Sequence, residues 1–278
     1  MKNEKRRIVP TPYEVGRYAV VPGTAPFVFH IRFQPEALTE VGILEKLINV
    51  LTEKGIPILL LKVSVATAGE AFTTILIADL KGKERMVEDI VQRMKRVPYV
   101  AEVLYALPII DGVAVDPFSF PLLMIGKRAV ILRQPVYGGM IKEGWTRFGT
   151  PYAILLYTVG YGAGLLAYKD HSKIISGPNV QKLAEALFQA MGFGRLEVVK
   201  LDDERREAVL RVYDSFECEL FLGAGEIRGN FIRGIIAGWL AGYWGVTGEF
   251  EVVAREVKCI AKGDSYCEYV ARVERKAV

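Results

Sequence analysis

Cysteine and histidine are scarce in this chain, with three cysteines and two histidines among 278 residues. An odd and small number of cysteines does not provide the disulfide framework of a small secreted domain. The sequence also lacks a Gly-x-Ser-x-Gly elbow, a phosphate-binding glycine loop and a His-Glu-x-x-His pair. These absences argue against a serine hydrolase, a P-loop nucleotide-binding protein and a zincin-type protease, and we expect a protein that is not an enzyme.

The sequence also lacks a large excess of positive or negative charge. The net charge is +4, and the longest basic cluster is Lys5, Arg6 and Arg7, so no nucleic-acid-binding surface is predicted. No apolar run follows the basic N-terminal residues, so we expect no secretory signal peptide and a cytoplasmic location. Residues 148–168 carry no charge and are long enough to cross a bilayer, but their Thr, Tyr and Gly content favours a buried helix of a soluble protein over a membrane span.

The overall composition is that of a folded globular protein, with 51% hydrophobic and 24% charged residues. A chain of this length has room for two domains. Proline and aromatic residues interrupt the periodic pattern over residues 111–127, which is typical of a linker. We therefore predict an N-terminal tail over residues 1–26, a first domain over 27–112 and a second over 113–278.

The first domain alternates between strand and helix patterns. Strands are predicted at 27–33, 56–66, 72–80 and 101–109, and amphipathic helices at 42–55 and 85–97. This βαββαβ order predicts a ferredoxin-like unit, in which two helices cover one face of a four-stranded antiparallel sheet. The segment "GILEKLINVLTEKGIPI" resembles the ACT family of small regulatory domains, which commonly bind amino acids between two copies. The overall fold class is predicted to be α+β.

Two apolar segments of the second domain, residues 157–168 and 232–245, combine glycine with aromatic residues. In the second, Gly234, Gly238 and Gly242 are spaced at one-turn intervals, and each costs a helix about 1 kcal/mol relative to alanine. Either close packing against a neighbouring helix or chain, or space for a small apolar ligand, would explain them. For a ligand, the predicted lining residues are Phe148, Tyr157, Tyr161, Gly238, Trp239, Gly242 and Tyr243.

Two of the three cysteines flank a turn near the C-terminus. In "EVKCIAKGDSYCEY", the Gly263-Asp264 turn can return the chain so that Cys267 lies beside Cys259, with Glu256 three residues before Cys259. Sulfur and carboxylate ligands of this kind suit zinc, and a fourth ligand would come from elsewhere in the chain. Cys218 is the other available thiol. Alternatively, all three cysteines are small apolar side chains in a core.

The segments "DSFECEL", "RGNFIRGIIAGWLAGYWG" and "EVKCIAKGDSYCEY" together resemble the 4-vinyl reductase domain family. The resemblance extends from about Phe118 to the C-terminus. It implies an α/β domain with an antiparallel sheet and glycine-rich helices that binds small molecules or hydrocarbons. Relatives include trafficking-complex subunits and bacterial phenol sensors.

In the phenol sensors, three cysteines and a glutamate hold zinc, which implies Glu256, Cys259 and Cys267 as ligands here. The third cysteine of those sensors corresponds to Arg233 in this chain. Two alternatives follow: Cys218 supplies the missing sulfur, or Arg233 pairs with Glu256 in a site without an ion. His30 and His171 are expected to have ordinary structural roles.

The sequence thus predicts a cytoplasmic regulatory or sensor protein. It would bind a small hydrophobic or aromatic ligand, form a homodimer and act through a protein partner. One alternative is a dimeric scaffold or adaptor, in keeping with the trafficking relatives. Another is an accessory protein in tetrapyrrole or aromatic metabolism, which the family name alone suggests.

Overall fold

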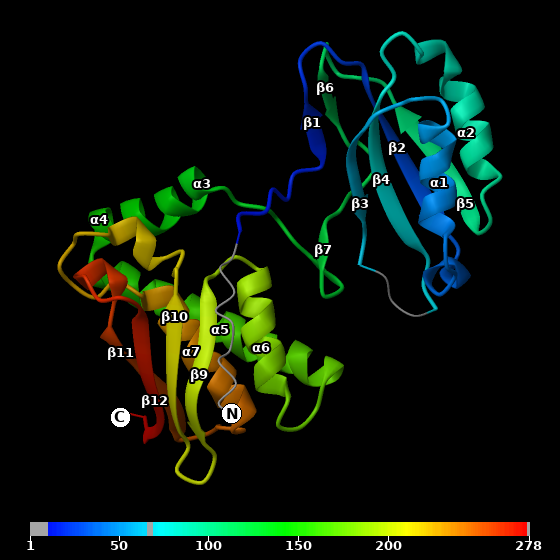
Figure 1. Ribbon diagram of the computed structural model, residues 1–278. Coiled ribbons are helices and arrows are strands. Elements are labelled where there is room, and N and C mark those ends of the chain that lie inside the picture. Colours follow the sequence, from blue (N-terminus) through cyan, green and yellow to red (C-terminus); the bar gives the residue numbers. More distant parts are fainter. Residues whose placement is uncertain (1–10, 66–68, 277–278) are drawn as a thin grey trace, which may run out of the picture. The chain divides into compact units, whose positions relative to one another are not determined.

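The computed structural model describes residues 11–65 and 69–276 (Figure 1). Helices and antiparallel sheets occur together in both parts of the chain, so the fold class is α+β. Internal contacts divide the chain into two compact units, the first ending at Leu122 and the second beginning at Leu123. Each unit has its own hydrophobic core.

The first unit is built on an antiparallel sheet in the order β3-β4-β2-β5, with α1 and α2 on one face (Figure 1). In β2, Phe27, Phe29, Ile31 and Phe33 alternate into the core beneath the helices, as a half-buried strand requires. The predicted βαββαβ order is confirmed, whereas kinship with ACT domains stays a prediction. The elements are β1 (Tyr18–Val20), β2 (Pro26–Phe33), α1 (Ile43–Thr52), β3 (Ile58–Val63), β4 (Phe72–Asp79), α2 (Val87–Lys95), β5 (Val100–Ala106) and β6 (Val113–Val115), with short 3-10 turns η1 (Pro35–Leu38) and η2 (Glu84–Met86).

A two-stranded ribbon completes the first unit. β1 pairs with β6, so that Ala19 lies opposite Ala114, and both side chains are buried against Val28 and Ile77 on the sheet face away from the helices. This pairing places residues 18–20 in a strand, although the sequence suggested a tail. The pairing also places residues 113–115 in the first unit, which ends at Leu122, whereas the sequence suggested that the second domain begins at residue 113.

The second unit contains an antiparallel sheet in the order β11-β12-β10-β9, and α7 packs against β11 and β12 (Figure 1). The long helix α5 lies along α7. The elements are β7 (Leu123–Met124), β8 (Lys127–Arg128), α3 (Gln134–Gly138), the π-helical turn η3 (Gly139–Glu143), α4 (Gly144–Phe148), α5 (Thr150–Ile174), α6 (Val180–Ala190), β9 (Arg195–Asp202), β10 (Glu207–Tyr213), η4 (Cys218–Phe221), α7 (Asn230–Tyr243), β11 (Phe250–Lys258), η5 (Ile260–Lys262) and β12 (Cys267–Arg275).

Glycines allow α5 and α7 to approach with their backbones in contact. A Cβ on Gly164 would collide with the Ile235 carbonyl oxygen, and a Cβ on Gly238 would collide with that of Tyr161. Close helix packing therefore explains the glycine spacing. The Tyr161 backbone occupies the space beside Gly238, which favours the packing alternative at this position.

Helix α5 is buried on one face only. Gly160, Gly164 and His171 are buried in this helix, whereas Ile154 and Leu166 are 62% and 57% exposed. The expectation of a buried helix is thus correct only for the face toward α7. Within residues 11–65 and 69–276, no helix combines the length and hydropathy of a bilayer-spanning segment.

Candidate metal centre and apolar cavity

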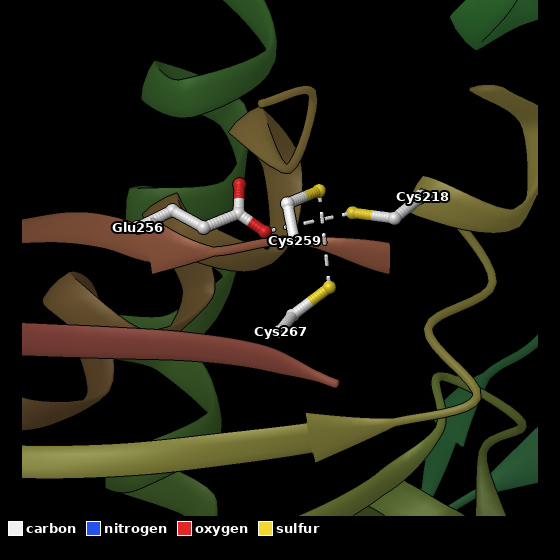
Figure 2. Close-up of side chains that lie close together, drawn as sticks. All are labelled: Cys218, Glu256, Cys259 and Cys267. Carbon is white, nitrogen blue, oxygen red and sulfur yellow. Dashed lines mark hydrogen bonds between the residues drawn. The ribbon is translucent and has the colours of Figure 1, made fainter. Parts of the chain in front are cut away.

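The three cysteines and Glu256 converge in the second unit. Glu256 lies in β11, Cys259 directly follows this strand, Cys267 begins β12, and Cys218 begins η4. Figure 2 shows the three sulfur atoms and the carboxylate pointing toward one another. All four residues are buried, and their potential ligand atoms lie within 4.8 Å of one another.

The turn between β11 and β12 is held by its own polar groups. Gly263 has a positive φ of 107°, which favours glycine. The Asp264 carboxylate accepts a hydrogen bond from the Cys259 N–H at 2.8 Å, and the Asp264 N–H donates to the Cys259 carbonyl at 3.1 Å. These bonds return the chain so that the Cys259 and Cys267 sulfurs lie 4.0 Å apart.

The geometry of the four side chains fits a tetrahedral metal ion. The Cys218 sulfur lies 3.8 Å from Glu256 Oε1, similar to the Cys259–Cys267 separation of 4.0 Å. Zinc–sulfur bonds of about 2.3 Å place neighbouring sulfurs of a tetrahedron about 3.8 Å apart. Three sulfurs and one carboxylate oxygen are also a donor set that suits zinc.

Burial and mutual hydrogen bonding perturb the acidity of this cluster. Burial raises the pKa of Glu256 to about 8, although its Oε2 accepts a hydrogen bond from the Gly229 N–H at 2.9 Å. Hydrogen bonds with Cys218 and Cys267 hold the pKa of Cys259 well below its usual range, and the bond with Cys259 raises the pKa of Cys218. A divalent cation would bind the deprotonated groups and release these protons.

Two further residues bear on the fit. The Tyr269 hydroxyl is buried and has no hydrogen-bond partner among the described residues, and a Cβ on Gly229 would meet both this hydroxyl and Glu256 Oε2. A buried hydroxyl without a partner beside the cluster is consistent with a site that a further group completes.

Arg233, the alternative to Cys218, points elsewhere. It donates to Asn230 Oδ1 at 3.1 Å and lies over the Tyr157 ring. The structure therefore brings Cys218, and not Arg233, to the cluster.

The aromatic residues predicted to line a ligand site are not gathered around one cavity. Trp239 is buried and stacks on Tyr243, with ring centroids 5.4 Å apart. Phe148 is 59% exposed. A Cβ on Gly242 would meet the Tyr168 ring, so Gly242, like Gly238, is a packing position. At Gly238 and Gly242 the close packing of the glycine helices favours the packing alternative, and a ligand role for the aromatic residues stays a prediction.

Tyr243 and the remaining tyrosines also have other contacts. The Tyr243 hydroxyl donates to Asp203 at 3.1 Å and lines a separate, open groove of about 490 Å³. Tyr157 and Tyr161 supply the carbonyl oxygens over which Gly234 and Gly238 pack. Their rings lie near each other at 6.4 Å between centroids. These tyrosines therefore belong to the helix crossing.

A larger apolar cavity of about 610 Å³ lies elsewhere in the second unit. None of the described residues that line it is charged. Its aromatic residues come from distant segments, so local periodicity could not reveal it. The residues used below are Tyr137, Ile141, Leu156, Phe193, Phe216 and Phe231.

Comparison with known proteins gives the following relationships. No protein-family model matches the chain. It is 30% identical over 139 residues to an uncharacterized protein of Methanocaldococcus jannaschii, an alignment that covers 49% of this chain and 73% of that protein.

Two solved structures are similar at low identity. One is the phenol-responsive sensory domain of the transcription activator PoxR with phenol, at 17% identity, 53% coverage of this chain, 78% of that chain and a TM-score of 0.47. The other is a vinyl-4-reductase family protein from Methanocaldococcus jannaschii, at 20% identity, 54% and 85% coverage and a TM-score of 0.34.

Proposed function

Because the chain belongs to the same protein family as the uncharacterized protein of Methanocaldococcus jannaschii, whose name assigns no activity, we propose a function from the geometry of its own sites. The second unit binds a small hydrophobic or aromatic molecule in the 610 Å³ cavity. It also holds a structural zinc ion with Cys218, Glu256, Cys259 and Cys267. The protein acts as a regulator or sensor and not as an enzyme.

The apolar cavity is the observation that carries the ligand proposal. Uncharged side chains surround it, and its volume lies within the range of small-molecule sites. Transfer of an apolar molecule from water to such a lining gains about 25 cal/mol for each Å² that is buried. Tyr137 is among the lining residues, and its hydroxyl is proposed to form a hydrogen bond with a hydroxyl or carbonyl of the ligand.

The four-residue cluster supports a structural role for the metal. Four protein ligands complete a tetrahedral zinc site, so no coordination position is left for a substrate. Cys218 lies in η4, whereas Cys259 and Cys267 lie in the β11–β12 hairpin. A metal bound by all of them would connect these two segments. Bound zinc would supply folding free energy to this connection.

Regulation requires that the ligand favours one of two states of the protein. The first unit, with the strand and helix order of small regulatory domains, is proposed to carry the response to a protein partner. An ACT-like ligand for this unit is a prediction from its resemblance alone.

Thermal unfolding of the purified full-length chain tests the ligand proposal. Phenols, fatty acids and amino acids are added as separate classes, and an apolar or phenolic compound is expected to raise the melting temperature. Leu156→Trp fills the cavity and should abolish this rise, whereas Ile154→Trp, on the exposed face of the same helix, should retain it. No rise with any class, or an equal rise in Leu156→Trp, contradicts the proposal.

A homodimeric scaffold is the second candidate function, and the outer face of α5 favours it. Ile154 and Leu166 are more than half exposed, and no charged residue occurs from Thr150 to Tyr168. An uncharged, exposed helix face of this kind is typical of a protein interface. The face and the cavity meet on α5, because Leu155 and Val159 are also more than half exposed and line the cavity, whereas Ile154 and Leu166 do not line it.

A further inference from the structure

Glu217 is a fully buried carboxylate that lies outside the proposed ligand set. Its exposed fraction is 0%, and its two oxygens accept hydrogen bonds from the backbone N–H groups of Asn230 at 2.9 Å, Phe231 at 2.8 Å and Ile232 at 2.9 Å. These are the first N–H groups of α7, whose own N-cap, Gly229, has no side chain to offer. Glu217 therefore caps α7 from a distant segment of the chain.

The residues on each side of Glu217 belong to different sites. Phe216 lines the apolar cavity, whereas the Cys218 sulfur faces the metal-ligand cluster. Three consecutive residues thus run from the wall of one site to the wall of the other. Glu217 is held by three hydrogen bonds to the start of α7. A small displacement of Cys218 therefore also displaces Phe216 and the first turn of α7.

The start of α7 spans the same two sites. The Gly229 N–H donates to Glu256 of the cluster at 2.9 Å, whereas Phe231 lines the cavity. The rings of Phe231 and Phe216 meet edge to face, with centroids 6.2 Å apart. Glu217 therefore ties together two short segments, residues 216–218 and 229–231, each of which has one end at the cluster and one at the cavity.

From this arrangement we propose that Glu217 is a positioning residue that couples the two sites, so that the cavity wall depends on how Cys218 and Glu256 are held. The inference rests on the proposed function, since it assumes a metal at the cluster and a ligand in the cavity. Holding Cys218 in place fixes Glu217, then the first turn of α7, and then Phe231. The cavity is thereby preorganised for its ligand.

Coupling of this kind is reciprocal. If zinc at the cluster tightens ligand binding by some factor, the ligand must tighten zinc binding by the same factor. Typical couplings between two sites amount to about 5-fold to 150-fold in affinity. Removal of the Glu217 charge should reduce this factor while both sites remain able to bind, because Glu217 contributes no atom to either.

The linkage is tested with zinc and the uncharged fluorescent probe N-phenyl-1-naphthylamine on the full-length chain. Probe affinity is measured with and without zinc, and zinc affinity is measured by competition with a chelator, with and without probe. In the wild type we expect at least about a 5-fold gain in each direction. In Glu217→Gln the gain should fall toward 1, whereas Glu219→Gln, an exposed glutamate in the same turn, should keep the wild-type gain.

Amide hydrogen exchange supplies a readout that does not need the probe. Zinc should slow exchange at Phe231 and Ile232 in the wild type, and Glu217→Gln should lose this protection. Independent binding of zinc and probe in the wild type overturns the coupling but leaves the proposed function intact. If no probe binds yet zinc protects these amides, the ligand proposal fails and the positioning role stands. Unchanged exchange with zinc bound, or no zinc uptake, overturns the inference.

Discussion

Cys218 comes from η4, whereas the other three residues of the cluster belong to the β11–β12 hairpin. A metal held by all four therefore connects two segments that share no backbone hydrogen-bond ladder. Loss of one sulfur ligand leaves zinc with three protein ligands and breaks this connection. The stability that bound zinc would provide should consequently depend on Cys218.

We expect Cys218→Ser to lose stoichiometric zinc. At free zinc about 1,000 times the Kd, binding contributes about 4 kcal/mol to the free energy of unfolding of the wild type. Zinc content by mass spectrometry and urea unfolding with and without chelator would check this. Chelator should lower the stability of the wild type and have no effect on the variant. One zinc per chain in Cys218→Ser would contradict the assignment.

At the scale of elements, the crossing of α5 and α7 depends on glycines whose backbones touch. Gly238→Ala places a methyl group against the Tyr161 carbonyl and should destabilise the protein by about 1–3 kcal/mol through overpacking. Gly162→Ala is the matched control, since no atom lies within 4 Å of its Cβ position and alanine favours the helix. We expect this control to stabilise by up to about 1 kcal/mol in urea unfolding. Equal effects of both substitutions would argue against a tight crossing.

The same helix pair contains a pH-sensitive hydrogen bond. Trp239 Nε1 donates to Nδ1 of the buried His171 at 3.2 Å, which requires that this nitrogen carries no proton. Burial lowers the pKa of His171 from 6.5, although Asp170 opposes the shift. The unfolded chain therefore takes up the proton first, and the free energy of unfolding falls as the pH drops below 6.5 toward the folded pKa.

His171→Gln should remove this component of the pH dependence, because a glutamine oxygen accepts the Trp239 hydrogen bond without titrating. Urea unfolding of both proteins between pH 5 and pH 8 would show it, with carboxylate contributions cancelling in the difference. Parallel stability curves over this range would contradict the assignment.

At the scale of the whole molecule, the proposed association of the chain depends on the uncharged outer face of α5. We predict a homodimer through this face, and a charge at Leu166, which is 57% exposed, should disrupt it. Light scattering after gel filtration should give half the wild-type mass for Leu166→Glu and the wild-type mass for Lys169→Gln on the same helix. A monomeric wild type at micromolar concentration would rule out the prediction.

Local patterns predicted much of the fold and part of the candidate site. Alternation in β2 and helical spacing in α1 identified these elements because each buries one face. The turn at Gly263 likewise indicated that Cys259 and Cys267 are close. The spacing of the glycines around Gly238 could not decide between close packing and ligand space, because both alternatives require the same small residue, and the backbone of Tyr161 against Gly238 favours packing.

The sequence by itself determined the α+β class, the strand and helix order of the first unit and the hairpin that carries Glu256, Cys259 and Cys267, because these depend on short-range periodicity and turn chemistry. Only the tertiary structure decided that Cys218 joins this cluster, that Glu217 caps α7, and that Phe216 and Phe231 line an apolar cavity together with residues of α3 and α5. These features depend on residues far apart in the chain, and their contacts arise only when the sheet and helices pack.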